Sequence, residues 1–283
     1  AAPVFALART GALASAGSSV AEPPISIVVP CYNEAARLPV ARFREFVAQH
    51  DRMRFLFVND GSHDDTSAVL QRMHDGDPTH FSFIELAHNR GKAEAVRAGM
   101  LQALASDAAF AGYWDADLAT PLSEIPRFVH ALDDNPGYEI CFGSRVRLLG
   151  RAIDRNPYRH YLGRLFATVA SQVLRLPVYD TQCGAKLFRV TANARAIFAE
   201  PFTVNWTFDV EIIARVQAQR SVDARASRPP MQRLSDARAR RASVIYELPL
   251  NEWRDVAGSK VHARDFFRSL FEMLRIYTKY RRN

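Results

Sequence analysis

Two aspartates stand one residue apart at the end of an apolar run, in the sequence Tyr113-Trp114-Asp115-Ala116-Asp117. A β-strand directs alternate side chains to the same face, so Asp115 and Asp117 would point together where the strand ends. Paired carboxylates at a strand end suit a Mg²⁺ or Mn²⁺ ion that carries a diphosphate group. A solvated turn is the alternative, because such a pair is common by chance. Evidence from the rest of the sequence is needed to choose between a metal site and a solvated turn.

The elements around this pair alternate between strand and helix, which favours a mostly parallel sheet with helices on both faces. Strands are predicted over 25–29, 55–58, 81–84, 111–114 and 139–143, and helices over about 34–50, from 63 onward and over 91–104. Ligands of such sheets bind at the carboxyl ends of the strands. Asn59-Asp60, residues 89–92 and the Asp115/Asp117 pair all fall at such ends. Their coincidence favours a nucleotide-diphosphate site over three unrelated loops.

The second half of the chain holds two helices and a basic segment. An amphipathic helix is predicted over 158–176, and no acidic residue occurs between Arg155 and Tyr179. Residues 220–243 are rich in arginine, with two prolines in the middle, as is typical of an exposed, mobile insertion. The C-terminal unit, 261–283, is predicted to be an aromatic amphipathic helix over about 263–280 followed by a basic tail.

The composition predicts one large α/β domain over 23–260, preceded by a disordered extension over 1–22. The chain has 283 residues, of which 48% are hydrophobic and 24% charged, enough for a substantial core. Its three cysteines lie in apolar runs without metal-ligand spacing, so we expect them to be buried and reduced.

The net charge of +7 favours phosphate-bearing partners or an anionic membrane surface. No apolar run approaches the roughly 20 residues that span a bilayer. Because reduced cysteines are typical of a cytosol-like compartment, we expect a cytoplasmic protein, either free or on the cytoplasmic face of a membrane. A nucleic-acid partner is not expected, because the chain shows no recognition motif or aromatic platform.

Eight motifs together resemble one enzyme family. In chain order they are VVPCYNE (28–34), NDGSHDDT (59–66), NRGK (89–92), DAD (115–117), FGSR (142–145), DTQCGAKLF (180–188), WTFDVE (206–211) and GSK (258–260). The first four resemble the inverting family-two glycosyltransferases. The last four are similar to a narrower branch, the dolichyl-phosphate (polyprenyl-phosphate) β-glucosyltransferases.

This resemblance implies a GT-A fold, with a Rossmann-like sheet, and a nucleotide-sugar donor, most often UDP-glucose. The implied donor-binding residues are Pro30, Tyr32 and Glu34 around the nucleoside, Asp60 at the uracil, Lys92 near the base and diphosphate, and Asp115 at the ribose or the metal. Asp117 would ligate Mg²⁺ or Mn²⁺ directly.

Three departures from the family pattern bear on this interpretation. Asn59 stands where many members have Asp, but Asp60 is kept. Ala119 occupies a position where the related mannosyl-phosphate synthases place a metal-binding Gln, and this favours the glucosyl-type branch. The arginine-rich segment looks like an insertion, so the acceptor preference could differ from that of the eukaryotic enzymes.

The resemblance also implies a polyprenyl-phosphate acceptor. Such an acceptor is already an anion at neutral pH, so cations that hold it matter more than a strong base. Arg145, Lys186 and Lys260 are the candidate cations, and surface solvation or an ion pair with Asp180 or Asp209 is the alternative for each.

Asp209 and Glu211 do not share a helix face at this spacing. One of them would bind sugar hydroxyls or act as a base, and the other would orient Lys186 or Arg145. A soluble hydroxyl acceptor is the alternative function, and it would make Asp209 the general base. Trp206 and Trp253 would stack on the sugar or pack in the core.

The two predicted helices of the second half, over 158–176 and about 263–280, could either pack on the sheet or contact a membrane. Both could simply pack on the sheet, but the acid-free basic side of the first helix and the lipid acceptor favour an interfacial role. The motifs leave the transferred sugar and the oligomeric state open.

Overall fold

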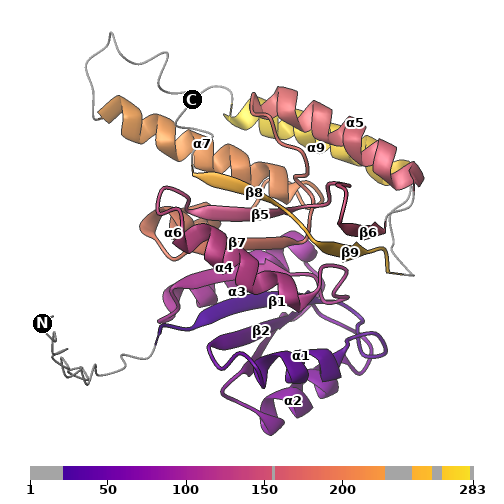
Figure 1. Cartoon of the computed structure of the whole chain (residues 1–283). Coiled ribbons are helices and arrows are strands. Elements are labelled where there is room, and N and C mark those ends of the chain that lie inside the picture. The colour runs from indigo at the N-terminus through magenta and orange to yellow at the C-terminus, as the bar shows by residue number, and fades with distance from the viewer. Residues whose placement is uncertain (1–21, 155–156, 227–243, 257–262, 281–283) are drawn as a thin grey trace, which may run out of the picture.

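The computed structural model of the chain describes residues 22–154, 157–226, 244–256 and 263–280 (Figure 1). The strands are β1 (Ile25–Cys31), β2 (Met53–Asn59), β3 (Phe81–Glu85), β4 (Phe110–Trp114), β5 (Ile140–Ser144), β6 (Ala152–Asp154), β7 (Ala185–Arg189), β8 (Ile245–Pro249) and β9 (Glu252–Arg254). The helices are α1 (Val40–Val47), α2 (Thr66–Gly76), α3 (Lys92–Ala105), α4 (Ile125–Asp133), α5 (Pro157–Leu174), α6 (Ala192–Ala199), α7 (Phe208–Ala226) and α9 (Ala263–Tyr280).

A seven-stranded sheet forms the centre of the described chain, in the order β3-β2-β1-β4-β7-β5-β8. Strands β1 to β4 pair in parallel, as the alternation of strands and helices predicts. β7 is antiparallel to both of its neighbours, β4 and β5. Its register pairs Trp114 with Ala185, so the residues that precede β7 lie at the carboxyl end of β4. This single antiparallel strand brings the 180–188 motif to the Asp115/Asp117 pair.

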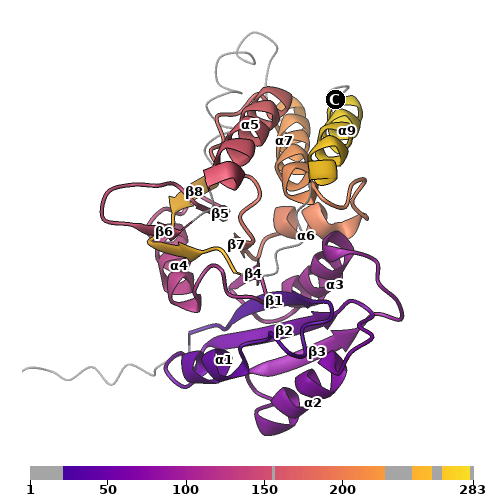
Figure 2. The same cartoon turned by 90° about the vertical axis from the view of Figure 1, so that its right-hand side faces the viewer.

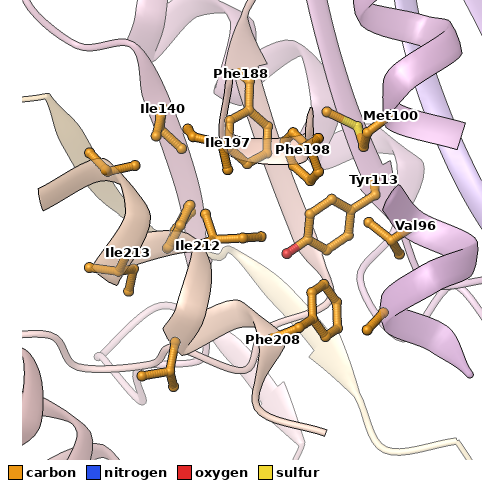
Figure 3. Packing of buried hydrophobic residues seen from close by; sticks show 14 of the residues in the cluster. Val96, Met100, Tyr113, Ile140, Phe188, Ile197, Phe198, Phe208, Ile212 and Ile213 are labelled. Atoms are coloured by element: carbon orange, nitrogen blue, oxygen red, sulfur yellow. The ribbon is translucent and has the colours of Figure 1, made fainter. Parts of the chain in front are cut away.

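Two apolar clusters cover the two faces of the sheet. One contains Phe43, Phe55 and Phe57 and lies against α1 and α2. The other surrounds Tyr113, which Figure 3 shows between Val96 of α3 and Phe208 of α7. Because successive strand residues point to opposite faces, β4 contributes Tyr113 to one cluster and Trp114 to the other. All three cysteines are buried and unpaired, which confirms that expectation.

Helices α5, α7 and α9 lie next to one another at one end of the molecule, as Figures 1 and 2 show. Within the described residues, no helix is long and apolar enough to cross a membrane.

Two predicted boundaries are wrong. The helix expected from residue 34 begins only at Val40, because Pro39 lacks an N–H and disfavours helical geometry in the residue before it. The sequence predicts that the basic insertion begins at Arg220, but α7 continues to Ala226. The remainder of that insertion, the extension over 1–21 and the GSK motif with Lys260 lie outside the described residues.

Candidate functional site

The site forms where the carboxyl ends of β1, β2 and β4 meet. The loop after β1 is joined to the loop after β2, because the N–H groups of Asn33 and Glu34 donate to Ser62 Oγ and Thr66 Oγ1, each at 2.9 Å. The N–H of Asp60 donates to the carbonyl of Cys31 at 2.8 Å. These bonds place Pro30, Tyr32 and Glu34, the predicted nucleoside-binding residues, beside the Asp60 loop.

Asp60 is buried, and its carboxylate holds the start of α3. Its Oδ1 accepts the N–H of Arg90 at 2.7 Å and its Oδ2 accepts the N–H of Gly91 at 2.8 Å. Gly91 has φ +89°, a conformation that favours glycine. Asp60 therefore fixes the position of Lys92, the first residue of α3. A contact of Asp60 with uracil stays a prediction.

Asp115 lies between Lys92 and Gly184. Its carboxylate accepts a hydrogen bond from the ammonium of Lys92. Its N–H donates to the carbonyl of Gly184 at 3.1 Å, and its side chain fills the space that a Cβ atom on Gly184 would need. Burial alone would lower the pKa of Lys92, but the charges of Asp115, Asp209 and Asp117 outweigh this and raise it.

Asp117 is exposed, and its Oδ1 accepts the N–H of Ala119 at 3.0 Å. Desolvation by the surrounding protein and the charge of Asp115 raise the pKa of its carboxyl group. A bound cation relieves the repulsion between two neighbouring carboxylates, so this pair favours one.

The described residues contain no group of three or more His, Cys, Asp or Glu side chains that could hold a metal ion. Mg²⁺ is nevertheless commonly bound by one or two carboxylates, with substrate phosphates as further ligands. The Asp115/Asp117 pair therefore fits a divalent ion that arrives with a diphosphate.

A buried ion pair lies behind Asp115. Lys186 is 0% exposed, and its ammonium donates to Asp209 Oδ1 and to the carbonyl of Cys183, both at 2.6 Å. The hydroxyl of Tyr113 donates to the same carboxylate oxygen of Asp209. Burial, followed by the charge of Asp209, raises the pKa of Tyr113 well above its usual value. Lys186 and Asp209 thus come together at the site but face each other rather than solvent.

Arg145 pairs with Asp180 through two of its three guanidinium nitrogens. Its Nε and Nη2 donate to Asp180 Oδ2 and Oδ1 at 2.6 and 2.8 Å, and its backbone N–H donates to Oδ2 at 3.1 Å. The guanidinium also lies over the ring of Trp253, 5.3 Å from its centroid. Burial would lower the pKa of Arg145, but the charge of Asp180 outweighs it and raises the pKa.

Glu211 is buried, and its partners come from the segment before α7 and from α9. Its Oε2 accepts the N–H groups of Thr203 and Val204, at 2.7 and 3.2 Å, and its Oε1 accepts the hydroxyl of Tyr280 at 2.7 Å. The neighbouring Trp206 is partly exposed, whereas Trp253 is buried. Sequence reasoning did not single out Gly184 or Tyr113, although Gly184 lies within a motif.

The family model described as "Glycosyl transferase family 2" matches residues 26–196, more than half of the chain. A dolichyl-phosphate β-glucosyltransferase of Drosophila melanogaster is 34% identical in an alignment 216 positions long, which covers 67% of this chain and 61% of that protein. The Saccharomyces cerevisiae enzyme of the same name is 28% identical over 84% of this chain and 69% of its own length. The match thus spans less than two thirds of the fly relative.

Two solved structures show the same fold. The mannosyltransferase PcManGT from Pyrobaculum calidifontis, in complex with GDP-Man and Mn²⁺, superimposes with a TM-score of 0.57 at 14% identity, over 93% of this chain and 66% of that one. Glucosyl-3-phosphoglycerate synthase from Mycobacterium tuberculosis gives 0.58 at 15% identity, over 90% and 80%. These similarities confirm the GT-A fold. The match of the family model and the identity with the fly protein show that the chain belongs to glycosyl transferase family 2.

Proposed function

We propose that the chain is an inverting, metal-dependent glycosyltransferase that moves a sugar, with glucose the first candidate, from a UDP-sugar to a polyprenyl or dolichyl phosphate. The observation that carries the proposal is the convergence of Asp115, Asp117 and Lys92 at the carboxyl edge of the sheet. The dolichyl-phosphate β-glucosyltransferases among the similar proteins support the lipid acceptor.

The donor is held by the loops that follow β1, β2 and β4. Asp117, with Asp115, would hold the Mg²⁺ or Mn²⁺ ion, which neutralises charge on the leaving diphosphate. Lys92 adds a second cation at the same place and is itself oriented by Asp115. Pro30, Tyr32, Glu34 and Asp60 bind the nucleoside.

Inversion follows from a single displacement at the anomeric carbon. An oxygen of the acceptor phosphate forms a bond to this carbon while the bond to the diphosphate oxygen breaks on the opposite face. The acceptor is already an anion, so no proton has to be removed. The geometry around Asp209 supports this reaction, because its Oδ1 already accepts from Tyr113 and Lys186. A hydroxyl acceptor, the alternative, would need Asp209 to leave these partners and act as a base.

On the acceptor side, we propose Arg145 as the contact to the phosphate and partly exposed Trp206 as a contact to the sugar or lipid. Lys186 and Glu211 are buried, so they would act by holding the chain around the acceptor. Lys260, the remaining candidate cation, keeps its proposed role from the motif alone.

A face of α9 and α5 is suited to the surface of an anionic membrane. Phe271 and Leu274 of α9 are 64% and 56% exposed and share their side of the helix with Arg268 and Arg275. Leu165 of the neighbouring α5 is also apolar and exposed, at 52%. Among the described exposed positions of both helices there is no acidic residue. Apolar side chains flanked by cations favour peripheral binding, here proposed at the cytoplasmic face.

Donor binding can be tested by titrating the protein with UDP-glucose in the presence and absence of Mn²⁺, with GDP-mannose as a competitor. We expect Mn²⁺-dependent binding of UDP-glucose that is lost in Asp117→Ala and that GDP-mannose does not displace. Binding that is equally tight without the ion, or preferred binding of GDP-mannose, would contradict the proposed donor site.

A further inference from the structure

The segment that joins α6 to α7 lies beside the proposed donor site and is held by buried side chains. Arg215 of α7 donates to the carbonyls of Ile197 and Glu200, both at 2.7 Å, and to that of Pro201 at 2.6 Å. Arg215 is buried, and its side chain also pairs with Glu211 at 3.0 Å. Arg215 thus binds both α6, through Ile197, and the start of the connection, through Glu200 and Pro201, which leaves the connection little freedom to move, as is required of a segment that positions a ligand.

Two buried carboxylates hold this segment on either side of Asn205. Glu211 of α7 accepts the N–H groups of Thr203 and Val204. Glu272 of α9 is 5% exposed, and its Oε2 accepts the N–H groups of Trp206 and Thr207 at 3.0 and 2.9 Å. Glu272 thereby also accepts hydrogen bonds from backbone N–H groups at the start of α7, where the helix dipole stabilises a negative charge.

Asn205 itself packs next to Gly91, the residue that precedes α3. Its Cγ is 3.9 Å from the position that a Cβ atom on Gly91 would occupy. Gly91 donates to Asp60 and precedes Lys92, so Asn205 adjoins the two groups that we assign to the donor.

We propose that Asn205 contacts the nucleotide-sugar donor and that Glu272 is the positioning residue that holds it there. Asn205 is exposed, and its amide both donates and accepts, as contact with phosphate oxygens or sugar hydroxyls requires. This inference rests on the proposed function, since it adds a residue to the same donor site. It also couples α9, the helix with the proposed membrane face, to donor binding.

Equilibrium titrations of the full chain with UDP and with UDP-glucose, in the presence of Mn²⁺, test the role of Asn205. Asn205→Ala should weaken the binding of UDP-glucose by about tenfold or more, since a hydrogen bond to a charged partner is lost. Equal weakening for UDP would place the contact on the nucleotide, and weakening for UDP-glucose alone would place it on the sugar. Asn135→Ala, an exposed change before the amino end of β5, is the matched control and should bind as the wild type does.

Two substitutions of Glu272 separate positioning from folding. Glu272→Gln keeps an acceptor oxygen at the same reach, so its affinity for UDP-glucose should stay within about threefold of the wild type. Glu272→Asp keeps the charge, but its shorter side chain moves the carboxylate away from the N–H groups. It should weaken the binding of UDP-glucose as Asn205→Ala does. The double variant Asn205→Ala/Glu272→Asp should bind UDP-glucose with about the affinity of whichever single variant binds it less tightly. The two changes are not additive, because both act on one contact.

The inference is overturned if Asn205→Ala binds both ligands like the wild type, or if the two changes are additive. Wild-type protein that is folded but binds neither UDP nor UDP-glucose would instead refute the proposed donor class, and this inference with it.

Discussion

The carboxylate of Asp115 rests directly on the backbone of Gly184, in a space that no other residue type at position 184 would leave open. On its other side, Asp115 accepts from the ammonium of Lys92. Asp115 is thus held in place by the protein, whereas Asp117 is exposed. The two aspartates therefore differ: Asp115 is fixed and its charge is partly neutralised by Lys92, whereas Asp117 is open to a cation.

Gly184→Ala should remove activity without removing the fold. The added Cβ atom would displace the Asp115 carboxylate from Lys92, and the loss of this partly exposed ion pair costs little stability. A displacement of this size at a reacting site typically lowers kcat/KM by about 100-fold. We expect that loss for UDP-glucose, with a nearly unchanged melting temperature. Gly137→Ala is the control, because no heavy atom lies within 4 Å of its Cβ position. A kcat/KM within twofold of the wild-type value would contradict the role of Asp115.

Asp117→Asn should raise the melting temperature at neutral pH. Because the folded-state pKa of Asp117 is raised above its usual 3.8, the folded chain binds this proton more tightly than the unfolded chain. Loss of the proton as the pH rises through the folded-state pKa therefore destabilises the fold. Melting curves of the two proteins should converge below the usual pKa of the carboxyl group and separate as the pH rises to 7.

Added Mn²⁺ gives the control for this prediction. It should raise the melting temperature of the wild type at pH 7 and leave that of Asp117→Asn unchanged, if the ion binds the folded state through this carboxylate as we propose. Its effect should fade as the pH falls and the carboxylate is protonated. Equal stabilisation of both proteins by Mn²⁺ would contradict Asp117 as a metal ligand.

Asp209→Asn tests whether Asp209 is a base or the partner of a buried cation. The change leaves the charge of Lys186 buried without a carboxylate, so we expect a loss of about 3–5 kcal/mol in the free energy of unfolding, measured with urea. If the acceptor is a phosphate, the folded variant should keep kcat within about tenfold, whereas loss of a general base lowers it by about 10²–10⁴-fold.

The double variant Lys186→Met/Asp209→Leu is the matched control for stability. It removes both charges together and should be more stable than Asp209→Asn. Unchanged stability of Asp209→Asn combined with abolished turnover would instead favour the hydroxyl acceptor.

The sequence was sufficient to predict the part of the site that depends on parallel strands. Asp60, Lys92 and the Asp115/Asp117 pair each follow a strand of recognisable composition, and parallel strands bring such ends together. The GT-A fold followed from the order of the motifs. The predicted fold and the placement of these residues at strand ends are confirmed, because they need only local patterns and one rule of sheet topology.

The partners of the cations could not be predicted in the same way. An ion pair with Asp180 or Asp209 was an alternative for either candidate, and the structure pairs Arg145 with Asp180 and Lys186 with Asp209. This choice depends on β7, which enters the sheet antiparallel between β4 and β5. Strand order of this kind arises from packing between distant segments, and no local pattern reveals it.

Phe271→Ser/Leu274→Ser should weaken binding to vesicles that contain phosphatidylserine, measured by co-sedimentation. Each buried apolar side chain contributes about 1.5–3 kcal/mol, so the partition coefficient should fall by about tenfold or more. Leu101→Ser is the control, because Leu101 is also exposed, at 37%, but lies on α3. Wild-type binding should weaken as salt is added, since cations flank the apolar side chains. Equal effects of the α3 and α9 changes would contradict the proposed membrane face.

The most direct test of the account is to follow radiolabelled glucose from UDP-glucose to undecaprenyl or dolichyl phosphate, in the presence of Mg²⁺ or Mn²⁺, by extraction into organic solvent. We predict label in the organic phase with the wild type and none with Asp117→Ala. No organic-phase label, together with release of UDP when water-soluble metabolites are added, would contradict the lipid-phosphate acceptor and point to a hydroxyl compound in its place.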